Sequence, residues 1–330
     1  MKNLIIKALV FAFLITTVST NAFVKSHIKI ADGHTVYYQY QKPQAGKPTV
    51  VLLNGILFFA ENWKEYYEEL SSKGYGVLLP IYSTQPESMQ FLKKKPFFKE
   101  TEFTLFGIKQ AGIETQTFID ETMAVIDHLN IDKFNLLSLS YGSTISVKLA
   151  SQYKNRIDNL ILISPAIVPT NRYNAPGEAR FQYYKKLKDY GPLIGQADYL
   201  YDAEFYLMLK SIMKPEHLSF PGVTFDDYFD GLYQMNRSVK WFDLKELAGV
   251  DLPPVYMFQA VNEEKSLKKD QLKFWKLMKK NKARKSLVTF EGSSHVIVYS
   301  TPIKAVEVTT KVIEGKLTKK SYHVKVEARD

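Results

Sequence analysis

The chain has 330 residues, a net charge of +10 at pH 7 and no cysteine. The lack of cysteine excludes a thiol nucleophile, a thiolate-bound metal and disulfides. Hydrophobic residues make up 45% and charged residues 24%, which is ordinary for a globular protein. The length suits one large α/β domain with an inserted lid, or two small domains.

Metal and nucleotide sites lack their usual sequence signals. The six histidines have no paired ligand spacing, and neither a Gly-x-Gly-x-x-Gly nor a Walker-type glycine loop occurs. We therefore expect no cofactor. The lysine-rich segments are scattered, which favours a basic surface over a nucleic-acid interface, and peripheral contact with an anionic membrane surface or a cell-wall polymer is compatible with it.

Residues 1–22 differ in character from the rest of the chain. Lys2 and Lys7 precede the uncharged apolar run Ala8–Ile15, and polar and small residues then lead to Ala22. This order is typical of a signal peptide, and the run is short for a bilayer-spanning helix. We predict cleavage after residue 22 and export to the periplasm or the medium; the alternative is an uncleaved N-terminal anchor.

The first predicted elements of the mature chain are strands. Val24–Ile30 and Thr35–Gln41 flank the turn signal Asp32-Gly33 and predict a hairpin. The continuous apolar and β-branched run Thr49–Leu53 predicts a central parallel strand that is buried on both faces. It ends at Asn54.

Helices and strands then alternate. We predict a helix over Asn62–Lys73, a buried strand over Gly76–Pro80 and a helix over residues 114–129. The aromatic segment Gln85–Gly112 has no regular period, and we interpret it as an irregular surface excursion near the site.

The alternation continues and predicts the fold class. Further strands are predicted at Phe134–Leu139, Asn159–Ser164, Val255–Gln259 and Ser286–Phe290, and Ser143–Ala150 is predicted to be a helix. Strands that alternate with helices predict a doubly wound, mostly parallel sheet.

An insertion divides this sheet. Residues 166–250 are rich in tyrosine and phenylalanine with helical spacing, and they predict a helical cap whose aromatics form its core and in part an apolar pocket. The core that contains the sheet would then comprise residues 23–165 and 251–315. Residues 316–330 are polar, and we assign them to a peripheral C-terminal tail without elements.

The junction between the strand ending at Leu139 and the following helix places Ser140 between the small residues Ser138 and Gly142. A strand that turns sharply into a helix leaves room only for small side chains at these flanking positions, and it exposes the central serine as a nucleophile elbow does. An incidental serine in a strand-to-helix turn is the alternative, so the partners of Ser140 decide between them.

A base and an acid follow in the chain. His295 lies in the loop after the strand Ser286–Phe290, and Glu263 and Glu264 follow the strand Val255–Gln259. Catalytic groups sit at the carboxyl ends of strands in such sheets, and a serine hydroxyl needs an imidazole base that a carboxylate orients. The order Ser140, Glu263, His295 is nucleophile, acid, base, although Glu264 competes for the acid position.

Over its mature length the chain resembles the α/β-hydrolase fold proteins. The resemblance is carried by the elbow, by the turn Asn54-Gly55-Ile56, by Ala260–Glu263 and by Gly292–His295. It implies Ser140 as nucleophile, His295 as base, Glu263 as acid, and the backbone N–H groups of Ile56 and Tyr141 as the oxyanion hole. The residues 54–55 and 138–142 also resemble the hydroxyalkanoyloxy-alkanoate synthase branch.

Several residues depart from that family's pattern. Ser138 replaces the first glycine of the elbow, Asn54 replaces a histidine, and Glu263 stands where aspartate is commoner. Tyr82 and Ser83 occupy positions where many relatives carry an acidic residue. Relatives that use an aspartate nucleophile carry it at the elbow, so Ser140 argues against dehalogenase and epoxide hydrolase chemistry.

The sequence therefore predicts an exported serine hydrolase that cleaves an ester or thioester with an apolar acyl group, its substrate being a small acyl ester or a lipid. Acyl transfer through the same three residues is one alternative. A catalytically inactive lipid-binding protein on the same fold is the other.

Overall fold

The computed structural model describes residues 23–30, 33–92, 102–104, 107–109, 114–167, 219–238, 250–278 and 283–326. The predicted signal peptide and most of the predicted cap lie outside these ranges. Within them, no helix has the length and apolar character needed to cross a membrane.

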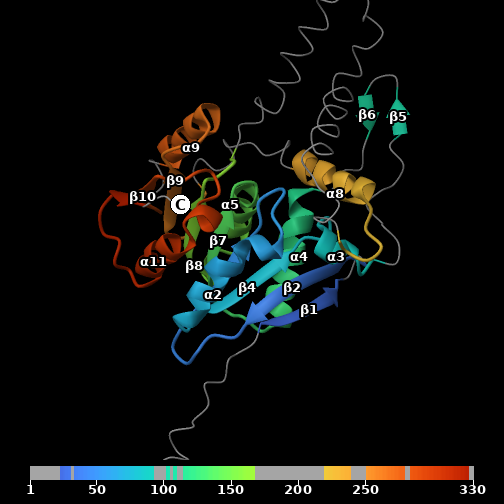
Figure 1. The fold of residues 1–330 in the computed structure, drawn as a ribbon, viewed down its shortest axis with the longest axis horizontal. Coiled ribbons are helices and arrows are strands. Elements are labelled where there is room, and N and C mark those ends of the chain that lie inside the picture. Colours follow the sequence, from blue (N-terminus) through green and yellow to red (C-terminus); the bar gives the residue numbers. More distant parts are fainter. Residues whose placement is uncertain are drawn as a thin grey trace, which may run out of the picture.

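A nine-stranded sheet forms the centre of the described part of the chain, in the order β1-β2-β4-β3-β7-β8-β9-β10-β11 (Figure 1). β1 pairs antiparallel with β2 and β2 antiparallel with β4, while the other neighbours are parallel. The predicted mostly parallel sheet and its N-terminal hairpin are confirmed. The strands are β1 (Val24–Lys29), β2 (Thr35–Gln41), β3 (Thr49–Leu53), β4 (Gly76–Ile81), β7 (Phe134–Leu139), β8 (Ile157–Ile163), β9 (Val255–Ala260), β10 (Arg284–Glu291) and β11 (Ser321–Lys325).

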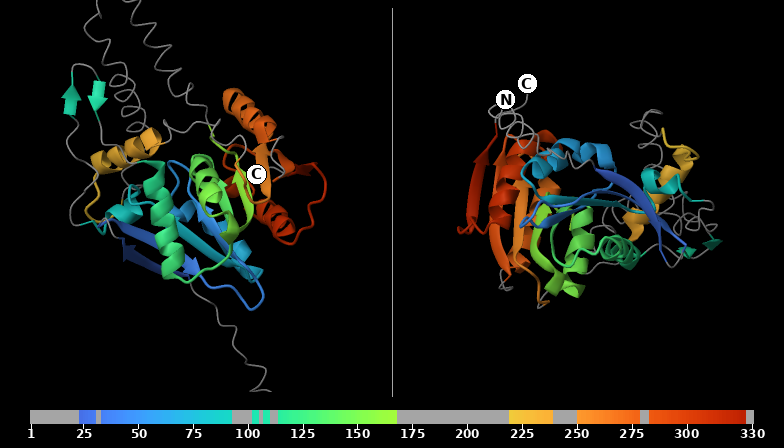
Figure 2. Two further views of the ribbon diagram at one scale, coloured as in Figure 1. Left: turned by 180° about the vertical axis from the view of Figure 1, so that it is seen from behind. Right: turned by 90° about the horizontal axis from the view of Figure 1, so that it is seen from below.

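Helices cover both faces of this sheet (Figures 1 and 2). The side chains of a strand point alternately to opposite faces, so Val51 and Leu53 belong to one core cluster and Val50 and Leu52 to the other. The first cluster includes α4 (Thr115–His128), α5 (Gly142–Gln152) and α9 (Lys265–Leu277), and the second includes α2 (Lys64–Ser72) and α11 (Pro302–Ile313). Two apolar layers therefore sandwich the sheet, which explains why strands such as β3 are apolar without alternation.

The C-terminal segment differs from the prediction. Ser321–Lys325 forms β11, which extends the sheet by pairing parallel with β10 from Leu287↔Ser321 to Glu291↔Lys325. Its side chains alternate between exposed and half-buried, as expected for an edge strand with one face towards water. Because its sequence is polar, the pattern that marks the buried strands is missing, and the prediction of a tail without elements misses this strand.

The segment after β4 also differs from the prediction. Residues 82–89 are buried, and Pro86–Met89 forms the short helix α3. Further along, residues 102–104 and 107–109 pair as the small hairpin β5–β6. The surface excursion predicted for Gln85–Gly112 is therefore wrong at its start, where the chain turns into the core instead of away from it.

One helix of the predicted cap region is described, α8 (Phe225–Ser238), and it lies beside α3 and α4 (Figures 1 and 2). Its buried side chains Tyr228, Leu232 and Met235 recur at helical spacing. At Gly231 a Cβ would lie 2.1 Å from the carbonyl oxygen of Thr84, so glycine is required for this close approach. The remainder of the cap stays a prediction.

The buried carboxyl group of Glu87 lies near the contact between α8 and the segment that contains α3. One oxygen of Glu87, on α3, accepts a hydrogen bond of 2.8 Å from the N–H of Ala60, and the other has no hydrogen-bond partner within the described structure. Burial raises the pKa of Glu87 to about 7. The backbone hydrogen bonds lower the pKa and offset the effect of burial only in part. Tyr37 on β2 and Tyr228 on α8 also interact with this group electrostatically.

We predict that Glu87 makes the fold less stable as the pH rises. The unfolded chain releases the Glu87 proton near its ordinary pKa of 4.5, whereas the folded chain holds the proton until about pH 7. The free energy of unfolding should therefore fall between these values, and Glu87→Gln should remove that fall. Urea unfolding at about pH 5 and about pH 8 should show the variant gaining roughly 2–3 kcal/mol relative to the natural protein. An equal difference at both pH values would contradict the prediction.

Candidate active site

Ser140 lies at the turn between β7 and α5, in a backbone conformation that few residues adopt. Its φ is +51°, in the left-handed region, which costs of order 1–3 kcal/mol for a residue with a side chain. Its N–H donates to the carbonyl of Ile163 at 2.9 Å, and its own carbonyl accepts from Ser143 and Ala166. These bonds hold the strained turn, and the serine remains 9% exposed.

Gly142 permits the turn to approach the end of β3. A Cβ at this position would lie 2.5 Å from the carbonyl oxygen of Asn54 and 2.9 Å from that of Leu53. Such distances are too short for real contacts, so only glycine fits. A Cβ on Gly55 would meet the Cβ of Ser140 at 3.4 Å, which places the turn of residues 54–56 directly against the serine.

Ser138 is accommodated where the elbow pattern has glycine. Its side chain is buried at the end of β7, and its hydroxyl lies 2.7 Å from the Ser146 hydroxyl and 3.3 Å from that of Ser143. A buried hydroxyl without partners would cost about 1–3 kcal/mol, and these two serines on α5 supply the partners. Ser143 and Ser146 on the following helix therefore satisfy the hydroxyl that Ser138 introduces in place of glycine.

His295 reaches the serine from the loop after β10. Its Nε2 lies 2.8 Å from the Ser140 hydroxyl, across 155 residues of sequence. On the other side of the ring, Nδ1 lies 2.9 Å and 3.0 Å from the two carboxylate oxygens of Glu263. The imidazole side chain is 32% exposed, whereas that of Glu263 is 1% exposed.

The structure distinguishes the two acidic candidates after β9. Glu263 contacts His295, whereas the Glu264 carboxylate accepts a hydrogen bond of 2.9 Å from the N–H of Leu267 in the first turn of α9. A carboxylate in that position acts as a helix N-cap. Glu264 therefore has a separate structural partner, and the structure brings Glu263, Ser140 and His295 together.

Glu263 is held as an ionised acceptor. Burial acts to raise its pKa, but hydrogen bonds from His295, Gln271 and the Glu264 N–H outweigh burial and hold the pKa below its ordinary value. Gln271 on α9 donates to Glu263 at 3.0 Å, and Gln259 on β9 donates to Gln271 at 2.9 Å. With an ionised acceptor at Nδ1, the proton of the neutral imidazole lies on Nδ1 and Nε2 is free to accept the serine proton.

The residues of the two predicted oxyanion donors lie next to the serine. Ile56 belongs to the turn that contacts Ser140, and Tyr141 precedes the first residue of α5, at the positive end of that helix. The Tyr141 hydroxyl lies 2.6 Å from the Ser238 hydroxyl on α8. The residue after the serine is thus also a contact between the core and the cap region.

The sequence pattern of the α/β hydrolase fold family matches residues 48–193. The chain has the α/β-hydrolase fold. Solved structures support the fold: an epoxide hydrolase from an endophytic Streptomyces has a TM-score of 0.62 at 15% identity, with 92% of this chain and 99% of that chain covered. An α/β hydrolase enzyme from a Medee basin deep-sea metagenome library has a TM-score of 0.58 at 17% identity, covering 88% and 96%. A bacterial membrane phospholipase A has a TM-score of 0.56 at 14% identity, covering 96% and 99%.

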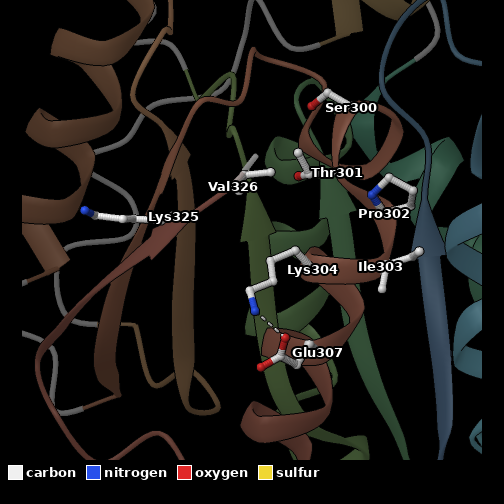
Figure 3. Close-up of a pocket in the computed structure, with 8 residues that line it drawn as sticks. All are labelled: Ser300, Thr301, Pro302, Ile303, Lys304, Glu307, Lys325 and Val326. Carbon is white, nitrogen blue, oxygen red and sulfur yellow. Dashed lines mark hydrogen bonds and ion pairs between the residues drawn. The ribbon is translucent and has the colours of Figure 1, made fainter. Parts of the chain in front are cut away.

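The protein also has a surface groove of about 490 Å³ between α10 (Ile297–Ser300), α11 and β11 (Figure 3). Its lining includes Ile303, Lys325 and the ion pair Lys304–Glu307, whose atoms are 2.6 Å apart. Ser140, His295 and Glu263 do not line it, so the groove is separate from the site. The described residues contain no group of three or more metal-ligating side chains.

Several supporting residues of the hydrolase site are absent from the sequence-based prediction. Gln271 and Gln259, which fix Glu263, lie on elements without a motif, and Ser238 lies in the cap region. Glutamine and serine are common, and only the packing of α9 and α8 brings Gln271 and Ser238 to the site, while β9 places Gln259 beside Gln271. No local pattern in the sequence marks them.

Proposed function

We propose that this protein is an exported serine hydrolase that cleaves carboxylic esters or thioesters with an apolar acyl group. The observation that carries the proposal is the unbroken hydrogen-bonded series from the Ser140 hydroxyl through His295 to Glu263. It occurs at an elbow whose serine is held at positive φ. This arrangement supplies a nucleophile, a base and an acid in mutual contact.

In the proposed reaction Ser140 Oγ attacks the carbonyl carbon while His295 Nε2 takes the hydroxyl proton. The imidazolium that forms is stabilised by the ionised Glu263. When the tetrahedral intermediate collapses, the ester or thioester bond breaks and the leaving group takes the proton from Nε2. Water then attacks the acyl-enzyme with His295 again as base, which releases the acid and restores Ser140.

The negative charge on the tetrahedral oxygen requires donors next to Ser140. We assign this role to the N–H groups of Ile56 and Tyr141, because the first lies in the turn against the serine and the second at the start of α5. The positive end of a helix adds a favourable field for a developing oxyanion.

Aromatic side chains near the site support an apolar acyl group. Phe59, which follows the turn at Ile56, stacks with Phe220 at a ring-centroid distance of 6.3 Å and with Tyr228 at 5.8 Å. We therefore favour lipid-like acyl esters over small polar ones.

The two alternatives differ in what they require. Acyl transfer uses the same three residues and differs only in which hydroxyl reaches the acyl-enzyme, so products formed with an added acceptor alcohol would distinguish it. An inactive lipid-binding protein needs no nucleophile, and the assembled contacts of Ser140, His295 and Glu263 argue against it. The epoxide hydrolase that shares this fold is similar in fold alone.

We predict that a fluorophosphonate forms a single covalent adduct with the natural protein and none with Ser140→Ala. The reagent reacts much faster with a serine whose proton a neighbouring base removes than with an ordinary serine. The intact mass of each protein after incubation is the measurement. Absence of an adduct on a folded natural protein would overturn hydrolysis and acyl transfer together.

We predict a large difference between neighbouring acid variants. Glu263→Gln should lower kcat by roughly 10²–10⁴-fold, because an amide cannot stabilise the imidazolium or fix its tautomer. Glu264→Gln is the matched control and should leave kcat within about twofold while it weakens the N-cap of α9. Steady-state hydrolysis of an ester with a medium-length acyl chain is the measurement. Equal losses in both variants would contradict the assignment of Glu263.

Export and contact with anionic membranes complete the proposal. We expect the exported chain to begin at Phe23. Because its net charge is positive, we also expect it to sediment with anionic phospholipid vesicles at low salt but not with zwitterionic vesicles. The intact mass and a vesicle sedimentation assay are the measurements. A chain that retains residues 1–22 would contradict cleavage, and equal binding to both vesicles would contradict charge-based contact.

A further inference from the structure

The turn that carries Ile56 is supported by a buried side chain from the segment after β4. Gln85 is 2% exposed, and its Oε1 accepts hydrogen bonds from Asn54 Nδ2 at 3.3 Å and from the Tyr82 N–H at 3.2 Å. Its Nε2 donates to the carbonyl of Phe58 at 2.9 Å. A single amide therefore bonds to the residues that flank the turn on both sides, Asn54 before it and Phe58 after it.

The orientation of this amide is fixed by its partners. The indole N–H of Trp63 can only donate, so the Asn54 atom it contacts is the carbonyl oxygen. The Asn54 NH₂ group then faces Gln85, which must present its oxygen and direct its own NH₂ group to Phe58. Each hydrogen bond in the series from Trp63 to Phe58 determines the direction of the next.

The turn needs such support because it is strained. Leu57, between Ile56 and Phe58, has a φ of +67°, which is unfavourable for a residue with a Cβ. Such conformations persist where the surroundings determine them, and Gln85 holds the chain on both sides of Ile56 and Leu57. Without the amide, the turn would relax and the Ile56 N–H would change direction.

We propose that Gln85 is a positioning residue for the oxyanion hole, acting through the turn to aim the Ile56 N–H at the developing oxyanion. This inference rests on the proposed function. Gln85 does not touch the reacting atoms in this scheme. Its effect should fall on the transition state, where the donor is used, and not on the binding of the substrate.

The test uses Gln85→Met, which keeps the length of the side chain and removes its hydrogen bonds. Gln90→Met is a matched control, because Gln90 follows the same short helix and its side chain donates to the carbonyl of Glu87, outside the turn that carries Ile56. We expect Gln85→Met to lower kcat by roughly 10- to 100-fold with KM changed less than about threefold, since loss of a whole oxyanion donor costs about 10²–10³-fold. Gln90→Met should keep kcat within about twofold.

A second variant guards against failure to fold. Gln85→Glu retains the volume and the acceptor bonds. Its ionised carboxylate cannot donate to the Phe58 carbonyl, whereas its protonated form can, so we expect the loss of kcat relative to the natural protein at the same pH to be smaller at low pH than at high pH. An alkylboronic acid, which forms a tetrahedral adduct with an active serine, gives an independent measurement. Its affinity should fall across the Gln85 variants in proportion to kcat/KM, whereas a purely structural role would lower the thermal unfolding temperature without this proportionality.

The outcomes separate this inference from the proposed function. If the natural protein forms no fluorophosphonate adduct and hydrolyses no ester, both fall together. If the natural protein is active but folded Gln85→Met has an unchanged kcat, or Gln90→Met loses as much, the positioning role is overturned and the hydrolase assignment stands.

Discussion

The close contact between two turns at neighbouring strand ends is the constraint on which the site depends. β3 and β7 are adjacent parallel strands, so the turns that follow them emerge side by side. Gly142 allows these turns to meet, because the carbonyl oxygen of Asn54 lies only 2.5 Å from the position that a Cβ would take. A side chain at Gly142 would separate the serine from the turn that carries Ile56, and no arrangement of His295 or Glu263 could compensate for that separation.

The sequence predicted the parts of the molecule that depend on local patterns. Buried strands such as β3 are continuous apolar runs, and the elbow at Ser140 combines a strand, small residues and a helix. The order of Ser140, Glu263 and His295 follows from the order of the strands, because loops at the carboxyl ends of parallel strands converge. These predictions required only the period of the pattern and the direction of the sheet.

The remainder depends on packing between distant segments. The choice of Glu263 over Glu264 is made by Gln271 and by the start of α9, which a sequence of two adjacent glutamates does not show. Gln85 and Glu87 begin a segment that was predicted to be a surface excursion because it has no regular period, yet each is buried with partners in residues 54–60. The prediction also missed β11. This edge strand has one face towards water, so its sequence can be polar and lacks the apolar run that marks a buried strand.

The amide series through Trp63, Asn54 and Gln85 also constrains how this sequence can diverge. Each of its members has a fixed direction of donation, so a change at one position leaves an unpaired polar group at the next. A histidine at position 54 would place its donor and its acceptor differently from an amide, and the contacts with Trp63 and Gln85 would change in geometry. We therefore expect positions 54, 63 and 85 to change together in related sequences, while the residues around them change independently.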